Sequence, residues 1–150
     1  MARMKVAVFG AKGRMGAEIC RAVREAPDLE LVAALDVGDD RDAAGAADVA
    51  IDFTVPDAVM ANLEWCARNG VHAVVGTTGF TRDRLDQVGR WFAEGGCNAV
   101  VASNYAIGSL LMMRFAEIAA PFFESVEIIE LHHPNKVDAP SGTAVTTAQR

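Results

Sequence analysis

Basic residues are scarce in this sequence, and they do not cluster. The 150 residues carry 14 Lys and Arg against 20 Asp and Glu, which gives a formal net charge of −6. Because nucleic acids attract proteins through basic patches, this charge predicts no nucleic-acid partner. The run of about 20 apolar residues that a membrane-spanning helix needs is also missing, so no membrane association is predicted. The start, MARMKVAVFGAKG, is typical of a strand entering a turn rather than a signal peptide.

Cysteine is also rare, and its three copies lie far apart in the sequence. Cys20, Cys66 and Cys97 are odd in number, and two of them fall on apolar faces of predicted helices. This pattern indicates reduced, buried thiols in a cytoplasmic protein, with a nucleophilic cysteine as the less favoured alternative. No CxxC or HExxH spacing occurs, so the sequence predicts no metal site.

Hydrophobic residues are abundant, at 51% of the chain, and they form short β-rich runs that alternate with helical patterns. This alternation predicts an α/β fold, a Rossmann-like doubly wound parallel sheet covered by helices on both faces. Residues 37–48 leave no room for a long crossover helix. Residues 107–119 are apolar nearly all round, which predicts a deeply buried helix. The strands are expected at residues 5–9, 29–35, 49–53, 71–75 and 98–102.

A glycine-rich turn follows the first predicted strand. Gly10, Gly13 and Gly16 form a GxxGxxG pattern before a helical run that Pro27 ends. In dinucleotide-binding proteins such glycines allow a tight turn, an approach of the backbone to a pyrophosphate, and close packing of helix on strand. Asp36 ends the second strand twenty residues after Gly16, where a ribose-binding carboxylate belongs. A purely structural turn remains the alternative.

Two further polar loops follow later strands. Gly76-Thr77-Thr78-Gly79 comes after the fourth strand, and Ser103-Asn104-Tyr105 comes after the fifth. Because the carboxyl ends of parallel strands meet at one edge of a sheet, we expect both loops to face the ligand crevice. The alternative for the first loop is a tight turn before a helix that Thr81 caps.

The stretch ELHHPNKVDAPSGTA, residues 130–144, concentrates groups that carry protons or bind anions. It contains His132, His133, Lys136 and a Ser141-Gly142-Thr143 turn, between a predicted strand at 126–131 and a helix from Thr143. Histidine exchanges protons near neutral pH, and a helix amino terminus attracts anions. The combination predicts a site for a small acid whose carbon chemistry needs a proton. The alternatives are ordinary polarity, a metal site, which adjacent histidines on an extended chain would not easily form, and a plain helix cap.

The motifs VFGAKGRMG, VAIDFT, VVGTTGF, ASNYAIG and ELHHPNKVDAPSGTA occur in order from end to end of the chain. Together they resemble the 4-hydroxy-tetrahydrodipicolinate reductase family, formerly called dihydrodipicolinate reductase. The resemblance implies that His132 is the proton donor and acceptor, that Lys136 is a second proton donor, and that His133, Gly142 and Thr143 bind substrate. It implies cofactor contacts from Gly10, Ala11, Lys12, Gly13, Arg14, Met15, Asp36, Gly76, Thr77, Thr78, Ala102, Ser103, Asn104 and Tyr105.

The resemblance also implies an NAD(P)H-dependent reduction of a small cyclic dicarboxylate in lysine and diaminopimelate synthesis. Family members are longer, and their substrate domain builds a homotetramer. We therefore expect a dinucleotide-binding domain at residues 1–124, and at 125–150 only the first strand and the catalytic loop of a substrate domain. A non-catalytic nucleotide-binding module is the alternative. Glyceraldehyde-type or homoserine-type dehydrogenases are a weaker third option, because they do not explain HHPNKVDAPSGTA.

The sequence predicts that both NADH and NADPH are used. Asp36 favours the two ribose hydroxyls of NADH and repels a 2′-phosphate. Lys12 and Arg14 in the glycine turn, and Arg41 in the following loop, are cations that neutralise a 2′-phosphate unless they are merely solvated surface charges. With acids and cations both in reach, NADH should be equal or modestly preferred.

Overall fold

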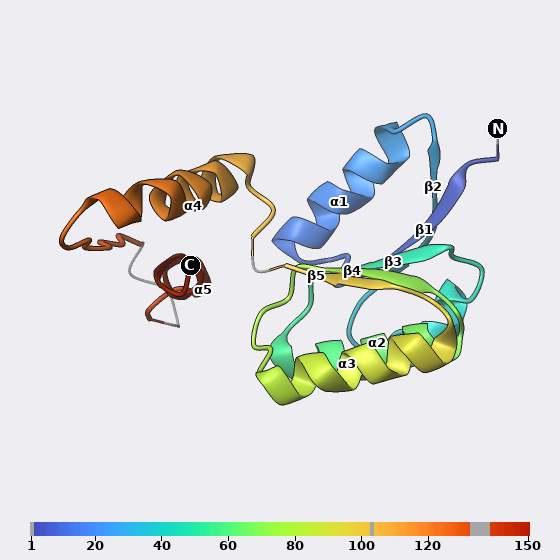
Figure 1. The fold of residues 1–150 in the computed structure, drawn as a ribbon. Coiled ribbons are helices and arrows are strands. Elements are labelled where there is room, and N and C mark those ends of the chain that lie inside the picture. The colour runs from blue at the N-terminus through green and yellow to red at the C-terminus, as the bar shows by residue number, and fades with distance from the viewer. Residues whose placement is uncertain (1, 103, 133–138) are drawn as a thin grey trace. The chain divides into compact units, whose positions relative to one another are not determined.

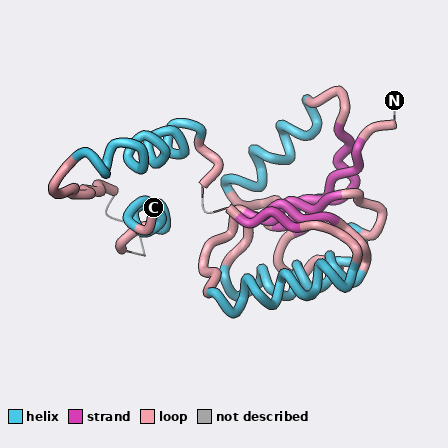
Figure 2. Tube along the Cα trace, in the orientation of Figure 1, coloured by secondary structure: helices cyan, strands magenta, loops and turns pink. Residues whose placement is uncertain are grey.

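The computed structural model describes residues 2–102, 104–132 and 139–150, and it divides the chain into two compact units. The first unit comprises residues 1–102 and the second comprises residues 103–150. Figure 1 shows the ribbon of both units, and Figure 2 shows that every strand among the described residues belongs to the first. The two units therefore divide after residue 102, whereas the sequence predicted a domain boundary after residue 124.

The first unit is built on a five-stranded parallel sheet. Its strands are β1 (Met4–Phe9), β2 (Leu29–Leu35), β3 (Val49–Asp52), β4 (His72–Val75) and β5 (Ala99–Val101). They lie in the order β2-β1-β3-β4-β5, and each neighbouring pair is parallel. The chain moves outward from β1 to β2 and then crosses to β3 on the other side of β1. This reversal leaves a switch point at the carboxyl end of β1, which is where open α/β sheets bind ligands.

Helices cover both faces of this sheet, as the sequence predicted. Helix α1 (Arg14–Glu25) lies on one face, and α2 (Pro56–Arg68) and α3 (Arg82–Gly95) lie on the other (Figure 1). Local signals set the boundaries: Pro56 stands at the start of α2, and the Thr81 hydroxyl accepts a hydrogen bond from the Arg84 N–H at the start of α3. The crossover between β2 and β3 is abbreviated to a 3₁₀ turn, η1 (Arg41–Ala44), which confirms that prediction.

The three cysteines are buried, as predicted, and are not disulfide-bonded. Cys66 and Cys97 belong to the main core between the sheet and the α2–α3 layer, and Cys20 belongs to a smaller core beneath α1. Burial raises the pKa of the Cys66 thiol to about 12, and burial also raises the pKa values of Cys20 and Cys97. A raised pKa disfavours the thiolate, which argues against a nucleophilic cysteine.

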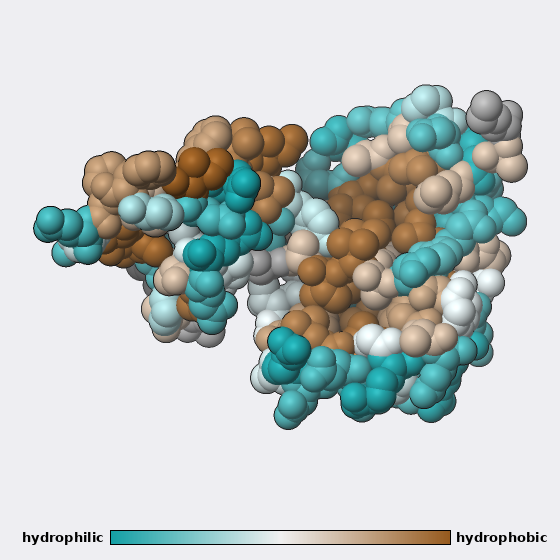
Figure 3. All heavy atoms as spheres, in the orientation of Figure 1, coloured by the Kyte–Doolittle hydropathy of each residue, from teal (hydrophilic) through white to brown (hydrophobic). Residues whose placement is uncertain are grey.

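The helical cover of the sheet is uneven within residues 2–102. The side chains of Val49, Ile51 and Val74 are half-buried, and Val100 is 57% exposed. Figure 3 shows apolar atoms gathered on the surface between α1 and α3. One helix on this face, against two on the other, leaves the β3–β5 half with less cover than the β1–β2 half.

The second unit contains α4 (Ile107–Ala119), a short 3₁₀ turn η2 (Ala120–Phe122) and α5 (Gly142–Ala148). The predicted deep burial of residues 107–119 is wrong. Met113 is buried, whereas Ile107, Phe115 and Ile118 are 73%, 63% and 52% exposed. An all-round apolar helix needs neighbours on every side, and α5 is too short to provide them. No helix in the described ranges is long and apolar enough to span a membrane.

The strand predicted at residues 126–131 is also not formed. These residues are described, and they have no strand hydrogen bonding. A strand is stabilised by pairing with another strand, and residues 104–132 and 139–150 supply no second one. The apolar side chains of Val126, Ile128 and Ile129 therefore stay exposed, at 57%, 45% and 81%.

Candidate functional site

A cleft of about 530 Å³ opens at the switch point of the first unit. This volume lies within the range of roughly 300–1,000 Å³ that small-molecule sites usually have. Its walls come from the loops after β1, β2 and β3 and from the first turns of α2. The lining residues are Phe9, Gly10, Gly13, Leu35, Asp36, Val37, Gly38, Asp39, Arg41, Phe53, Thr54, Val55, Ala58 and Asn62.

The glycine turn after β1 forms one wall of the cleft. Gly10 has φ +82°, and a Cβ added there would lie 2.5 Å from the Phe53 carbonyl oxygen, so only glycine fits. The N–H groups of Gly10 and Ala11 both donate to the Leu35 carbonyl, at 2.8 and 2.9 Å. Gly13 is the N-cap of α1 and has no side chain to cap it. The first N–H groups of α1 therefore remain available to an anion at the cleft.

Asp36 ties this turn to the end of β2. Its carboxylate accepts hydrogen bonds from the Lys12 N–H at 2.7 Å and the Val37 N–H at 2.9 Å. Hydrogen bonds from the Val37 and Lys12 backbones lower the pKa of Asp36, so the carboxylate is ionised at neutral pH. Each carboxylate oxygen keeps a further lone pair, which is what two ribose hydroxyls require.

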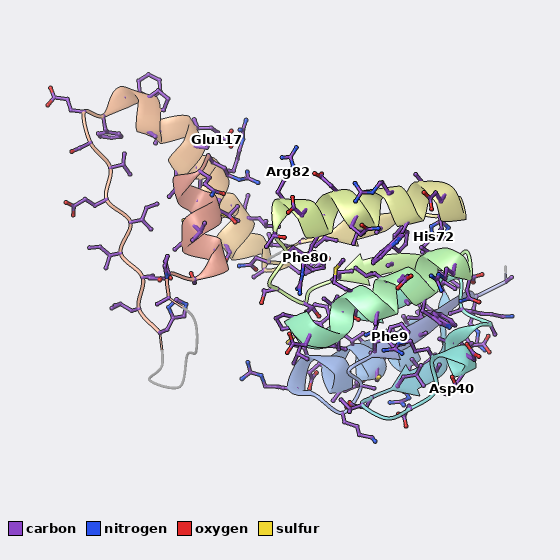
Figure 4. The ribbon with its side chains drawn as sticks, turned by 90° about the horizontal axis from the view of Figure 1, so that it is seen from below. Phe9, Asp40, His72, Phe80, Arg82 and Glu117 are labelled. Atoms are coloured by element: carbon purple, nitrogen blue, oxygen red, sulfur yellow. The ribbon has the colours of Figure 1, made fainter. Side chains whose placement is uncertain are left out.

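The end of β3 contributes residues to which the sequence alone assigns no role. Phe53 and Thr54 line the cleft, and the buried Asp52 beside them binds Thr54, Thr77 and Asn62 through its two oxygens. The motif VAIDFT contains this acid. Because the acid follows an apolar run, the sequence alone indicates only the end of a strand. Phe9, which is labelled in Figure 4, also lines the cleft, and its ring packs edge-on against Trp65 of α2 with centroids 6.3 Å apart.

The structure brings some predicted cofactor residues to the cleft and leaves others outside its lining. Gly10, Gly13 and Asp36 line it. Lys12, Arg14, Met15 and Thr78 are exposed side chains that do not form its wall. Gly76 packs on the Phe53 ring, since an added Cβ would lie 2.1 Å from it, and the Thr77 hydroxyl donates to Asp52 at 2.6 Å. Ala102 ends the first unit, and Asn104 and Tyr105 belong to the second.

A second group of polar residues gathers around the amino terminus of α5. The Glu130 carboxylate accepts two hydrogen bonds from the Ser141 N–H, at 2.9 and 3.1 Å, and its Oε2 lies 3.7 Å from His132 Nδ1. The Ser141 hydroxyl caps α5 by accepting from the Ala144 N–H. Asn104 Nδ2 donates to the Thr143 hydroxyl at 3.1 Å. Glu130 thus contacts both His132 and Ser141, and Ser141 lies two residues before Thr143.

Three predicted site residues lie outside the described residues: Ser103, His133 and Lys136. Their assigned roles stay predictions. Among the described residues, no three His, Cys, Asp or Glu side chains come together in a group that would hold a metal ion.

Comparison with known proteins gives consistent matches over almost the whole chain. Residues 4–105 match the model of the dihydrodipicolinate reductase N-terminus, and residues 108–150 match the model of its C-terminus. The 4-hydroxy-tetrahydrodipicolinate reductase of Streptomyces coelicolor is 57% identical over 99% of this chain and 61% of its own length. The corresponding protein of Thermobifida fusca is 60% identical over 97% of this chain and 60% of its own.

A solved structure agrees with these sequence matches. The chain is similar to the dipicolinate-bound dihydrodipicolinate reductase from Paenisporosarcina sp. TG-14, with a TM-score of 0.81 and 36% identity. The match covers 98% of this chain and 64% of that one. The chain therefore spans about 60% of the length of the curated relatives it matches.

Proposed function

The chain belongs to the dihydrodipicolinate reductase family, and on this premise we propose that it supplies the cofactor site and the proton-donating loop of a 4-hydroxy-tetrahydrodipicolinate reductase. The proposed reaction is the NAD(P)H-dependent reduction of a cyclic unsaturated imine dicarboxylate to tetrahydrodipicolinate. The observation that carries the proposal is the cleft at the switch point, where an uncapped helix amino terminus and an ionised Asp36 face the same space.

These residues offer the groups that bind a dinucleotide, an uncapped helix amino terminus and a carboxylate on one cleft. A bound nicotinamide cofactor supplies the hydride. The first N–H groups of α1 hold its pyrophosphate, and Gly13 keeps that approach free of a side chain. Asp36 accepts hydrogen bonds from the adenine ribose while the glycine turn holds its carboxylate in place.

The proton and the substrate carboxylates are assigned to residues 130–144. His132 gives the proton that the reduced substrate needs, and Glu130 Oε2 lies 3.7 Å from its Nδ1. Lys136 is proposed as the second proton donor. We assign His133, Gly142 and Thr143 to the substrate carboxylates. The dipicolinate bound to the reductase from Paenisporosarcina sp. TG-14 supports a dicarboxylate as the substrate. Assembly into a homotetramer and a cytoplasmic location belong to the same proposal.

Binding and turnover separate this function from a non-catalytic nucleotide-binding module. We expect the intrinsic fluorescence of NADH to change on titration with the chain, and freshly prepared substrate to be reduced by the protein at the full length of its relatives. Cofactor binding without any turnover at full length would favour the module.

The ratio of kcat/KM for NADH and NADPH tests the role of Asp36. We expect both cofactors to be used, with NADH equal or modestly preferred. Asp36→Ser should shift the ratio toward NADPH, and replacing both Lys12 and Arg14 with Ala should shift it toward NADH. Salt must be fixed, because phosphate contacts are screened. A native preference for NADPH above about tenfold would contradict the argument from Asp36.

Asp28→Ser is the matched control for Asp36→Ser. Asp28 is exposed and lies before β2, at the opposite end of the strand from the cleft. Its replacement removes the same charge, so it should leave the cofactor ratio unchanged. An equal shift from Asp28→Ser would show that overall charge, rather than the position of Asp36, sets the preference.

A further inference from the structure

Asp52 is a carboxylate that is 2% exposed and satisfied entirely by hydrogen bonds. Its Oδ1 accepts from the Thr54 N–H at 3.1 Å, the Thr54 hydroxyl at 2.7 Å and the Thr77 hydroxyl at 2.6 Å. Its Oδ2 accepts from Asn62 Nδ2 at 2.7 Å. A buried acid is costly unless such partners hold it. Four donors to a single carboxylate hold the Asp52 side chain in one orientation directly behind the cleft wall.

Asn62, on α2, connects Asp52 to a residue of the cleft lining. It is 5% exposed, and its Oδ1 accepts a hydrogen bond from Arg41 Nε at 2.7 Å. A carboxylate cannot donate and a guanidinium cannot accept, so the NH₂ group of Asn62 faces Asp52 and its carbonyl oxygen faces Arg41. An amide can make both contacts because it carries a donor and an acceptor. The Asp52–Asn62 pair therefore holds the guanidinium of Arg41 by its inner nitrogen.

A second contact holds the η1 turn that carries Arg41. Trp65 Nε1 donates to Asp42 Oδ1 at 2.9 Å, one turn further along α2 than Asn62. Adjacent residues of η1 are thus bonded to the same helix face, by Arg41 to Asn62 and by Asp42 to Trp65. The side chains of Arg41 and of its neighbour Asp42 are therefore both held by α2.

The two outer amino groups of Arg41 remain for a ligand. Arg41 lines the cleft beside Asp36 and Asp39, yet the described residues give it no ion pair within 4.0 Å and no hydrogen bond beyond the one to Asn62. The acids are engaged elsewhere: Asp36 accepts from Lys12 and Val37, and Asp39 Oδ2 accepts from the Asp36 N–H at 2.8 Å. Its anchor is a neutral amide, so no carboxylate among the described residues pairs with the guanidinium.

We propose that the buried Asp52–Asn62 pair positions Arg41 to bind the 2′-phosphate of NADPH in the cleft. The proposal rests on the proposed cofactor function and deepens it. A guanidinium fixed through Nε presents its outer nitrogens in one plane, which matches the two-point binding of a phosphate. Asp36 then accepts hydrogen bonds from the ribose hydroxyls of NADH, and Arg41 binds the 2′-phosphate of NADPH. Asn62 and Asp52 are positioning residues.

The test compares two adenine nucleotides that differ by the phosphate in question. Binding of adenosine 2′,5′-bisphosphate and of 5′-AMP to the 150-residue chain is measured by calorimetry at fixed salt. Wild type should bind the bisphosphate more tightly. Arg41→Gln and Asn62→Leu should each reduce that preference about tenfold, and the double variant should lose no more than Arg41→Gln alone. A merely structural role of Asn62 would weaken both nucleotides equally, and that result would overturn the proposal.

Arg41→Lys tests the anchor without touching the core. Lysine keeps the charge but has no Nε–H to give to Asn62 and no planar fork, so the preference for the bisphosphate should fall as it does in Arg41→Gln. Full retention of the preference in Arg41→Lys would overturn the anchoring role. Arg68→Gln on α2 is the charge-matched control, since Arg68 pairs with Glu64 and lies outside the cleft lining, and it should leave the preference intact.

The wild-type measurement distinguishes failure of the proposed cofactor function from failure of the proposed role of Arg41. A chain that binds neither nucleotide would overturn the cofactor function itself, and the further proposal with it. A chain that binds 5′-AMP but gains nothing from the 2′-phosphate would overturn the role of Arg41 alone and leave the NADH site standing.

Discussion

His132→Ala and Lys136→Ala are each expected to lower kcat by about 10²–10⁴ at the full length of the protein's relatives, with little change in NADH affinity. The magnitude is that of losing one positioned proton donor. The structure supports the assignment of His132, since Glu130 lies 3.7 Å from Nδ1 and is itself fixed by the Ser141 N–H. Turnover is measured with freshly made substrate, and NADH affinity by fluorescence titration. Because His133 is proposed to bind the substrate rather than to give a proton, His133→Ala should raise KM more than it lowers kcat.

His72→Ala is the control for these substitutions. His72 is an exposed histidine at the start of β4, and its Nδ1 accepts a hydrogen bond from the Asn98 N–H at 3.0 Å (Figure 4). This contact is structural, so the variant should keep its turnover. Near-native turnover in both His132→Ala and Lys136→Ala would show that the catalytic assignment is wrong.

The sheet of the first unit could be predicted because its signals are local. The short β-rich runs, Pro56 at the start of α2 and Thr81 before α3 each act through neighbouring residues. The parallel order then follows from the alternation of strands and helices. Asp36 was predictable for the same reason, since its distance from the glycine turn along the chain fixes its place at the end of β2.

Features that depend on distant partners could not be predicted in this way. Nothing in the sequence shows that Asn62 stands between Asp52 and Arg41, which lie 10 and 21 residues away from it. The apolar pattern of residues 107–119 predicted burial, but burial needs a surface to pack against. The run at 126–131 is a strand in pattern only, because a pattern supplies no hydrogen-bonding partner.

Gly13→Val and Gly16→Ala are expected to fail in different ways, although both glycines belong to one turn. Gly13 is exposed, with φ −70° and ψ 163°, a conformation that any residue adopts. A Cβ there would lie 3.2 Å from the Gly10 carbonyl oxygen, a contact that a small shift relieves. Gly16 is buried, and a Cβ there would lie 1.9 Å from the same oxygen, which belongs to the backbone and cannot move aside.

We therefore expect Gly13→Val to weaken NADH binding about 100-fold, because its methyl groups occupy the space between the first N–H groups of α1 and a pyrophosphate. Its free energy of unfolding should fall by no more than about 1 kcal/mol. Gly16→Ala should lower that free energy by about 3 kcal/mol or more, since overpacking against fixed backbone forces α1 away from β1. Fluorescence titration with NADH and denaturant unfolding monitored by circular dichroism measure the two effects.

Unchanged NADH affinity in a folded Gly13→Val variant would contradict the assignment of this turn to the pyrophosphate. A Gly16→Ala variant as stable as the wild type would show that α1 can shift on the sheet, and the third glycine would then be dispensable for packing.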